Sequence, residues 1–166
     1  MSSTTLRQTV FSPCRRYRYA LWRKWDARRP AYALFIGLNP STADEVTDDP
    51  TLRRCVGFAK AWGYDAVCVA NLFALRETDP AELKKHPEPV GDDNDRWLKA
   101  LARSAEVVIA AWGVHGGFMG RDRAVRCMLA GKLSYLALSK GGQPRRPLYL
   151  RSSLVPRSWR RRSREA

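Results

Sequence analysis

Four short apolar runs predict the strands of one sheet. They cover residues 32–36, 66–70, 107–111 and 133–138, and each is rich in Val, Ile, Leu, Ala or aromatic side chains. Continuous apolar runs of this length are typical of parallel strands that are buried on both faces. Helical segments lie between them, and strands that alternate with helices predict a parallel sheet flanked by helices on both faces.

Capping residues predict where the helices lie. One helix is expected to begin after Asp48-Asp49-Pro50 and to end before Gly63, because aspartate and proline suit a helix start and glycine suits its end. A second is expected near residues 92–95, whose acids suit the positive end of a helix dipole. A third is expected over 121–129. The segment 14–26, in which arginines alternate with aromatic residues, predicts an added edge strand or hairpin.

The predicted fold class is therefore α/β. We expect a three-layer α/β/α domain over residues 1–155, with a central, mainly parallel four-stranded sheet and the N-terminal edge strand or hairpin. Residues 156–166 contain five arginines and one acid, and we expect them to form a disordered basic tail.

The charge of the chain indicates an anionic partner. The sequence contains thirty Lys and Arg residues and sixteen Asp and Glu residues, which gives a formal net charge of +14. Nucleic acid, most simply DNA, is the expected partner, although a basic surface kept for solubility is the alternative. The sequence has no apolar run long enough for a membrane span and no apolar N-terminal signal, so we expect a cytoplasmic protein with no membrane partner. We also expect a monomer, although the sequence does not determine the oligomeric state.

The four cysteines predict neither a metal site nor a disulfide. No two of them form a C-x-x-C pair, and Cys68 lies inside an apolar run where a thiol behaves as a small hydrophobic group. We therefore expect no metal and no cofactor.

Polar and glycine-rich segments follow the predicted strands. These segments are 37–41, 71–76, 112–117 and 141–150. In an open parallel sheet, ligands bind beyond the carboxyl ends of the strands. We therefore expect the four segments to build a ligand site along one edge of the sheet.

Motifs in these segments resemble known families. FIGLNPSTAD, DDPTLRRC, ANLFALRETDP and GQPRRPLYL together resemble an uncharacterised bacterial and phage family known as a domain of unknown function, over about residues 14–150. A broader similarity is to the uracil-DNA glycosylase superfamily. GLNP at 37–40 resembles its Gly-Ile-Asn-Pro motif, VCVANLFALR at 67–76 resembles its base-reading strand and loop, and AAWGVHGG at 110–117 resembles its Trp-Gly segment.

This similarity implies a DNA glycosylase-type hydrolase that cleaves the N-glycosidic bond of a flipped-out pyrimidine or modified base. Asn39 would position the attacking water through its side-chain carbonyl, and Asn71 would read the base with a donor and an acceptor. Arg146 stands where the superfamily often has a histidine that stabilises the departing base. Its planar fork suits a phosphate equally well.

The similarity implies two further groups of site residues. Phe73 or Trp112 would stack on the flipped base, and Leu148 and Tyr149 would fill the gap that it leaves. The implied base-binding set is Gly37, Leu38, Pro40, Asn71, Phe73, Trp112 and His115; the implied nucleic-acid-binding set is Ser41, Arg76, Arg145, Leu148 and Tyr149.

Structural explanations compete with these roles. Asn39 before Pro40 suits a turn, Asn71 could satisfy backbone groups at a strand end, and His115 between glycines could be a loop residue. Capping explains Asp48 or Asp49 better than acid catalysis does. Two other functions also stay open: an enzyme acting on a free nucleoside, nucleotide or RNA base, and a reader that recognises an unusual base without cutting it.

Overall fold

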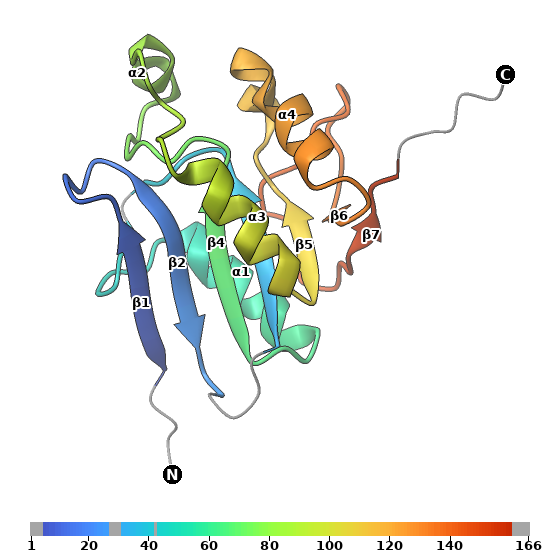
Figure 1. Ribbon diagram of the computed structural model, residues 1–166. Helices are drawn as coiled ribbons and strands as arrows, with labels where there is room; N and C mark the ends of the chain where they lie inside the picture. Colours follow the sequence, from blue (N-terminus) through green and yellow to red (C-terminus); the bar gives the residue numbers. More distant parts are fainter. Residues whose placement is uncertain (1–4, 27–30, 42, 161–166) are drawn as a thin grey trace, which may run out of the picture.

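The computed structural model describes residues 5–26, 31–41 and 43–160, which form a sheet with helices packed on it (Figure 1). The sheet has seven strands in the order β1-β2-β4-β3-β5-β6-β7. The strands are β1 (Leu6–Phe11), β2 (Arg18–Lys24), β3 (Tyr32–Gly37), β4 (Ala66–Asn71), β5 (Val107–Ala110), β6 (Leu133–Tyr135) and β7 (Arg157–Ser158). The helices are α1 (Pro50–Ala61), α2 (Pro80–Lys85), α3 (Asn94–Ser104), the 3₁₀ segment η1 (Val114–Gly120) and α4 (Arg121–Met128).

The four apolar runs form four neighbouring strands, but they are only part of the sheet. Strand β3 pairs in parallel with β4 on one side and β5 on the other, and β5 pairs in parallel with β6. The other three pairings, β1 with β2, β2 with β4 and β6 with β7, are antiparallel. The expected four-stranded, mainly parallel sheet is therefore too narrow, and the fold is mixed α/β. The missed strands carry arginines or are very short, so no apolar run marks them.

An N-terminal hairpin is present, with a different arrangement from the one predicted. Strand β1 pairs with β2, and β2 also pairs with β4, from Leu21 opposite Val69 to Lys24 opposite Ala66. The predicted segment 14–26 thus contributes an interior strand, and β1 supplies the edge. Burial follows from this position: Tyr19, Ala20 and Leu21 are all buried.

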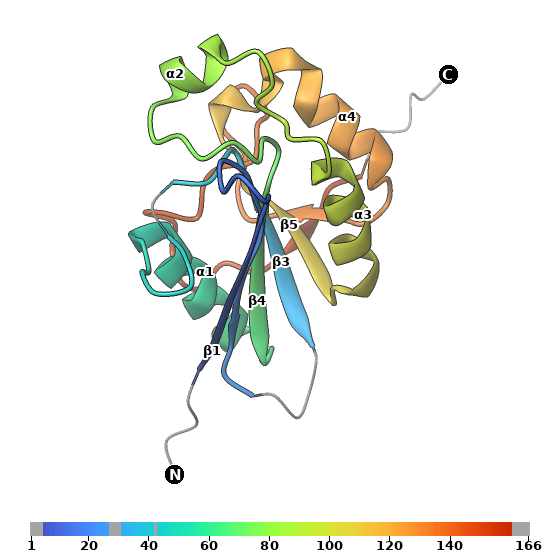
Figure 2. The same ribbon diagram turned by 60° about the vertical axis from the view of Figure 1, so that its left-hand side comes forward.

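Helices cover both faces of the sheet, as Figures 1 and 2 show. On one face, Leu52, Cys55 and Phe58 of α1 pack in a core cluster with Phe35 and Val67 of the sheet. The other face carries a second cluster, which includes Leu98 and Leu101 of α3 and Val125 of α4. The two clusters are built from alternate strand residues, because successive side chains of a strand point to opposite faces.

The predicted helix starts are confirmed for α1, α3 and α4. Asp49 caps α1, since its carboxylate accepts a hydrogen bond from the Leu52 amide at 2.7 Å, and Pro50 follows it. The short helix α2 was not predicted, although Asp79 caps it in the same way through the Ala81 amide. Its six residues are too few for a clear apolar period.

The first residues of the predicted basic tail are ordered. Strand β7 pairs with β6 through Ser134 opposite Ser158, and the Trp159 ring packs 5.7 Å from the Trp112 ring. The expectation of disorder is therefore wrong for residues 157–160, because Trp159 gains apolar contacts that anchor the strand. Residues 161–166 lie outside the described residues.

Within the parts of the chain that the structure describes, no helix is both long and apolar enough to cross a lipid bilayer.

Thiol labelling of the native protein should separate the cysteines into two pairs. Cys55 and Cys68 are buried, which raises the pKa of both thiols, whereas Cys14 and Cys127 are exposed. A hydrogen bond with Ser12 Oγ lowers the pKa of Cys14 and enriches its reactive thiolate. Iodoacetamide should therefore modify Cys14 first and spare Cys55 and Cys68 until the protein unfolds, as peptide mass spectrometry would show. Early modification of Cys55 or Cys68 would contradict this packing.

Candidate functional site

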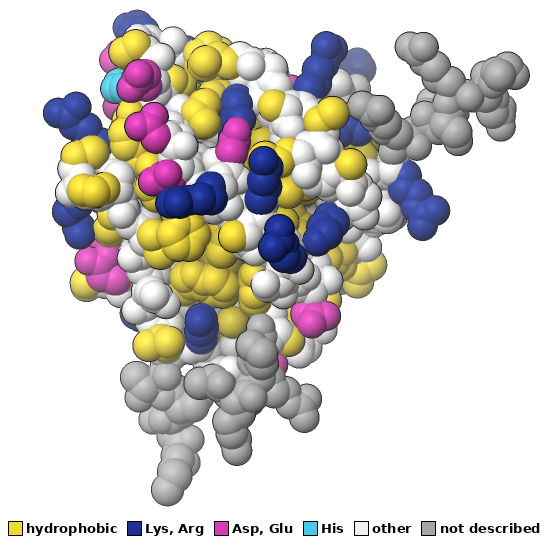
Figure 3. All heavy atoms as spheres, viewed as in Figure 1, with side chains coloured by type: hydrophobic (Ala, Val, Ile, Leu, Met, Phe, Trp, Pro, Cys, Tyr) yellow, Lys and Arg dark blue, Asp and Glu magenta, His cyan; other side chains and the backbone are white. Residues whose placement is uncertain are grey.

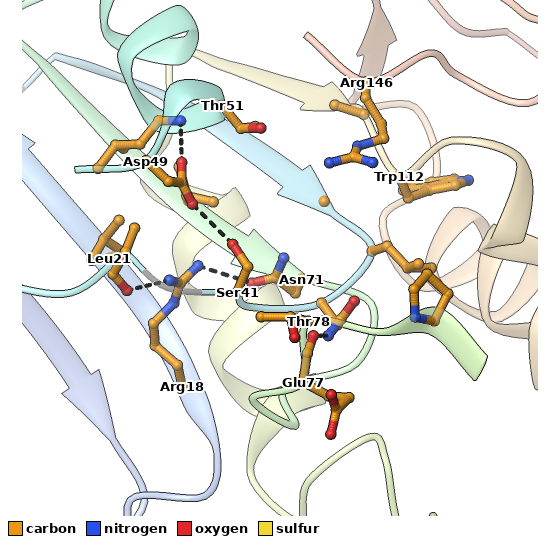
Figure 4. A pocket seen from close by; sticks show the side chains of 18 of the residues that line it. Arg18, Leu21, Ser41, Asp49, Thr51, Asn71, Glu77, Thr78, Trp112 and Arg146 are labelled. Carbon is orange, nitrogen blue, oxygen red and sulfur yellow. Dashed lines mark hydrogen bonds between the residues drawn. The ribbon is translucent and has the colours of Figure 1, made fainter. Parts of the chain in front are cut away.

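A pocket of about 270 Å³ opens at the carboxyl ends of β3, β4 and β5. Several predicted residues line it together: Gly37, Leu38, Asn39, Ser41, Asn71, Trp112, His115 and Arg146. Residues outside the predicted site complete the lining: the predicted cap Asp49 and, among others, Arg18, Leu21, Thr51, Glu77 and Thr78 (Figure 4). The expected convergence of strand-end segments is thus present in the structure.

Two buried side chains hold the segment after β4 in place. Asn94 Nδ2 donates to the carbonyl oxygens of Asn71 and Leu72 at 2.9 and 3.1 Å. The Arg121 guanidinium donates to the same Leu72 carbonyl and to Asp95. Because both side chains bond to backbone carbonyls of this segment, Asn71 is fixed at the base of the pocket.

A second buried arginine, Arg23, holds the segment before α1. Arg23 is 1% exposed and donates through Nε and Nη2 to one carboxylate oxygen of Asp48, at 3.0 and 2.8 Å. It also donates to the carbonyl oxygens of Trp22 and Asp44. These bonds position Asp49, whose second oxygen accepts from Ser41 Oγ at 3.0 Å. Asp49 therefore caps the helix and presents a carboxylate at the pocket wall.

Arg18 differs from the other two buried arginines because it has no carboxylate partner. It is 4% exposed, and it donates to the Ala43 carbonyl at 2.7 Å and to Asn71 Oδ1 at 3.4 Å. Its Nε has no hydrogen-bond partner, and it forms no ion pair within the described residues. Burial lowers the pKa of Arg18 to about 10, which leaves the guanidinium charged at neutral pH. No carboxylate of the described residues thus contacts this buried cation, although the charge of Asp49 in the same pocket favours its protonated form. Burial of a cation without a contacting counter-ion is costly unless a ligand compensates it.

Arg18 also decides which end of Asn71 faces the ligand. Arginine only donates hydrogen bonds, so the amide oxygen of Asn71 turns toward it. The Nδ2 group then lies beside Gly37, where an added Cβ would approach it to 2.9 Å. Figure 4 shows this nitrogen pointing away from Arg18. Asn71 therefore presents a donor to the pocket, and the predicted reading of a base edge by both ends of the amide is not available in this arrangement.

Asn39 has a structural role in addition to its place in the pocket. Its Nδ2 donates to the carbonyl oxygens of Pro40, Leu75 and Glu77 and so holds the loop after β4. None of the hydrogen bonds found among the described residues reaches its Oδ1. The oxygen that was predicted to position a water is thus the end of the amide that the loop leaves free.

Trp112 forms a rigid part of the pocket wall. It is 1% exposed, and its Nε1 donates to Gln143 Oε1 at 2.9 Å, while Gln143 in turn donates to Asp122. A Cβ at Gly116 would lie only 2.0 Å from Trp112 Cδ1, so glycine is required where η1 crosses the ring. A ring this enclosed cannot offer an open face for stacking, which makes Trp112 a wall of the pocket.

Arg146 and His115 stand at the pocket's outer side. The aliphatic stem of Arg146 packs against Gly113, which has φ of +75° and leaves room for it. Figure 4 shows Arg146 and Arg18 directed into the same space from opposite sides. His115 Nδ1 lies 3.2 Å from Lys84 Nζ of α2. Because a lysine ammonium only donates, this contact leaves His115 Nε2 as the protonated nitrogen that can face a ligand.

Other predicted residues do not line the pocket. Phe73 is fully buried against Phe118, so its predicted stacking on a base is wrong for this structure. Pro40 is buried outside the pocket lining. Arg76 lines a neighbouring hollow, while Arg145, Leu148 and the 90% exposed Tyr149 lie outside the pocket lining.

The pocket combines the cations Arg18 and Arg146, two acids and two amides that each have one end without a described bond. Such groups can bind and polarise an oxygen-rich or anionic ligand. Sequence reasoning missed Arg18 because its burial depends on β2 becoming an interior strand. No cluster of three or more His, Cys, Asp or Glu side chains that could hold a metal ion occurs within the described ranges.

Comparison with known proteins places the chain in a family without assigning its chemistry. No curated protein and no solved structure matches the chain. The family that does match is described as a protein of unknown function, DUF1643, and its match spans residues 18–148, which include every residue that lines the pocket. The chain therefore belongs to the DUF1643 family.

Proposed function

We propose that the pocket binds a nucleobase extruded from DNA and hydrolyses its N-glycosidic bond. The observation that carries the proposal is Arg18, a buried guanidinium that lines the pocket next to Asn71 and forms no ion pair with any described residue. Cleavage of this bond places negative charge on the departing base. A cation already fixed in a water-poor site stabilises such charge without having to reorganise.

Arg18 would stabilise the negative charge on the departing base, the role that a histidine often has in the uracil-DNA glycosylase superfamily. The departing base would lie between Arg18 and Arg146, with Asn71 Nδ2 donating to one of its acceptor atoms. The similarity of the GLNP and VCVANLFALR segments to that superfamily supports the same assignment of roles. Both segments contribute to one pocket, through Asn39 and Asn71.

Asn39 would act on the water. Its Oδ1 is free to accept a hydrogen bond from a water molecule, which orients the water's oxygen toward C1′ of the sugar. The water's hydroxyl group joins C1′, the bonding electron pair leaves with the base nitrogen, and the second proton ends on the departing base. An amide cannot take up a full proton, so we expect turnover to be slow.

A second candidate function, a reader that binds an unusual base without cutting it, is favoured by one observation. The hydrogen bonds that Asn39 donates to the Leu75 and Glu77 carbonyls of the loop, and to the neighbouring Pro40 carbonyl, account for an asparagine at this position without catalysis. A reader would keep the pocket and its donors and would have no use for an oriented water.

A cleavage screen separates the two functions. Labelled single- and double-stranded oligonucleotides would carry uracil, mismatched thymine, hypoxanthine or hydroxymethylated pyrimidines, with alkali used to reveal abasic sites. We expect cleavage of at least one substrate, reduced about 100-fold or more by Asn39→Ala, while oligonucleotide affinity changes little.

The matched control is Arg103→Ala, an exposed residue of α3 outside the pocket, which should cleave like the wild type. Thermal unfolding of each variant shows whether loss of the Asn39 bonds has loosened the loop. Tight binding with no cleavage of any substrate would overturn the glycosylase proposal and favour the reader.

A further inference from the structure

A second hollow adjoins the candidate pocket, and arginines make up much of its lining. It has a volume of about 580 Å³ and shares Ser41, Glu77 and Thr78 with the pocket. The rest of its lining comes from the β1–β2 turn, the loop after β4 and the end of α2: Arg15, Arg16, Leu75, Arg76 and His86. Three arginines thus face a hollow that continues from the candidate pocket.

Backbone contacts fix these arginines relative to one another. The Arg76 amide donates to the Arg16 carbonyl at 2.9 Å, and Arg76 Nη1 donates to the Arg15 carbonyl at 3.2 Å. Tyr17 also forms a bridge with Leu75. The turn and the loop therefore present their side chains as one surface.

Two of the arginines are ordered by the same aromatic ring. The Arg15 and Arg76 guanidinium carbons lie 4.2 and 4.7 Å from the centre of the Phe11 ring. Cation–π contact holds two like charges close together and reduces the side-chain freedom that a ligand would otherwise have to remove. Arg15 also has φ of +60°, a conformation that is costly for a side chain with a Cβ.

Little negative charge offsets this arrangement. Arg15 has a long ion pair of 3.7 Å with Glu45, and neither Arg16 nor Arg76 forms an ion pair within the described residues. The one acid in the lining, Glu77, accepts a hydrogen bond from the Asp79 amide. Figure 3 shows basic side chains, with acidic ones between them, at the left margin, where Figure 1 places the β1–β2 turn. Guanidinium groups with unused donors are suited to phosphate oxygens, which they bind through two parallel hydrogen bonds.

We propose that this hollow binds the phosphodiester backbone of the DNA strand whose base enters the candidate pocket. The proposal rests on the proposed function for the identity of the ligand, and it adds a partner surface to that function. Because Ser41, Glu77 and Thr78 line both hollows, a nucleotide in the pocket has its neighbouring phosphate beside Arg15, Arg16 and Arg76. Specificity then lies in the pocket and affinity in the adjoining hollow.

The test is the salt dependence of binding to fluorescein-labelled oligothymidylate, which requires no cleavage. The triple variant Arg15→Gln/Arg16→Gln/Arg76→Gln should bind at least about 10-fold more weakly near 0.1 M salt. On single strands each lost phosphate contact should make the slope of log affinity against log salt shallower by about 0.7. A triple lysine variant keeps the charges and should retain most of the slope.

The matched control replaces three exposed arginines of α3 and α4, Arg96, Arg103 and Arg123, with glutamine and removes the same charge. We expect its slope to stay within one unit of the wild-type slope. Equal losses in the two triple variants would overturn the proposal, as would a salt-insensitive wild type. If the triple variant does not fold, Arg16→Gln alone carries the test, because the Arg16 side chain forms no described bond.

The two proposals fail separately. A wild type that binds through the hollow but cleaves no substrate removes the glycosylase function and leaves the phosphate surface. Cleavage that persists with unchanged salt dependence in the Arg15, Arg16 and Arg76 variant removes the phosphate surface and leaves the catalytic pocket.

Discussion

Arg18→Met should reduce turnover at the candidate pocket about 100- to 1000-fold, the loss that follows removal of one preorganised donor to a developing anion. The same substitution should change the free energy of unfolding by no more than about 1–2 kcal/mol, because it removes a costly buried charge together with two hydrogen bonds. A large catalytic loss at nearly constant stability is the signature of a cation retained for its ligand. Single-turnover kinetics and urea unfolding measure the two quantities.

A conservative variant and a control sharpen this prediction. Arg18→Lys keeps the charge but loses the fork that reaches both Ala43 and Asn71, so it should recover only part of the activity. Arg103→Met removes a charge from the exposed surface of α3 and should leave turnover unchanged. If Arg18→Met instead unfolds the protein and its activity per folded molecule stays normal, Arg18 is a structural residue and the proposed mechanism loses its main support.

Gly116→Ala should lower the free energy of unfolding by about 3 kcal/mol, at the upper end of the usual cost of overpacking. The added methyl group would lie 2.0 Å from Trp112 Cδ1 and 2.4 Å from Nε1. The ring has little room to move, because Gln143 holds its nitrogen and Trp159 packs against it. For a chain of this size the change corresponds to a fall in Tm of about 6–12 °C.

The adjacent glycine provides the control for this effect. An added Cβ at Gly117 has no neighbour closer than 3.8 Å, so Gly117→Ala should shift Tm by no more than about 2 °C. Differential scanning calorimetry of both variants measures the difference. Equal Tm values for the two variants would mean that the Trp112 ring moves freely, and Trp112 could then not serve as a fixed wall of the pocket.

Both predictions concern residues whose importance depends on distant parts of the chain. Arg18 is separated by 53 positions from Asn71, the residue whose orientation it sets. Gly116 matters because Trp112, Gln143 and Trp159 lock one ring in place. Substituting either residue therefore tests the tertiary arrangement of the pocket more directly than substituting a residue on the loop surface.

The sequence by itself determined the local features of this protein. Apolar runs placed β3, β4, β5 and β6, because a strand buried on both faces has no polar position to interrupt it. Asp49 and Pro50 placed the start of α1, since capping depends only on neighbouring residues. The order of strands and polar segments also brought Asn39, Asn71 and Arg146 to one pocket, because parallel strands end at the same edge of a sheet.

Only the tertiary structure decided which side chains face the pocket and in what state. The sequence shows many arginines, yet ion pairs with Asp48 and Asp95 make the buried Arg23 and Arg121 structural. Arg18 has no such pair within the part of the chain that the structure describes. Phe73 has an aromatic ring that could stack on a base, but the structure encloses this ring in the core. The amide ends of Asn39 and Asn71 are set by loop carbonyls and by Arg18. Hydrogen-bond partners and counter-charges come from segments far apart in the chain, and only folding brings those segments into contact.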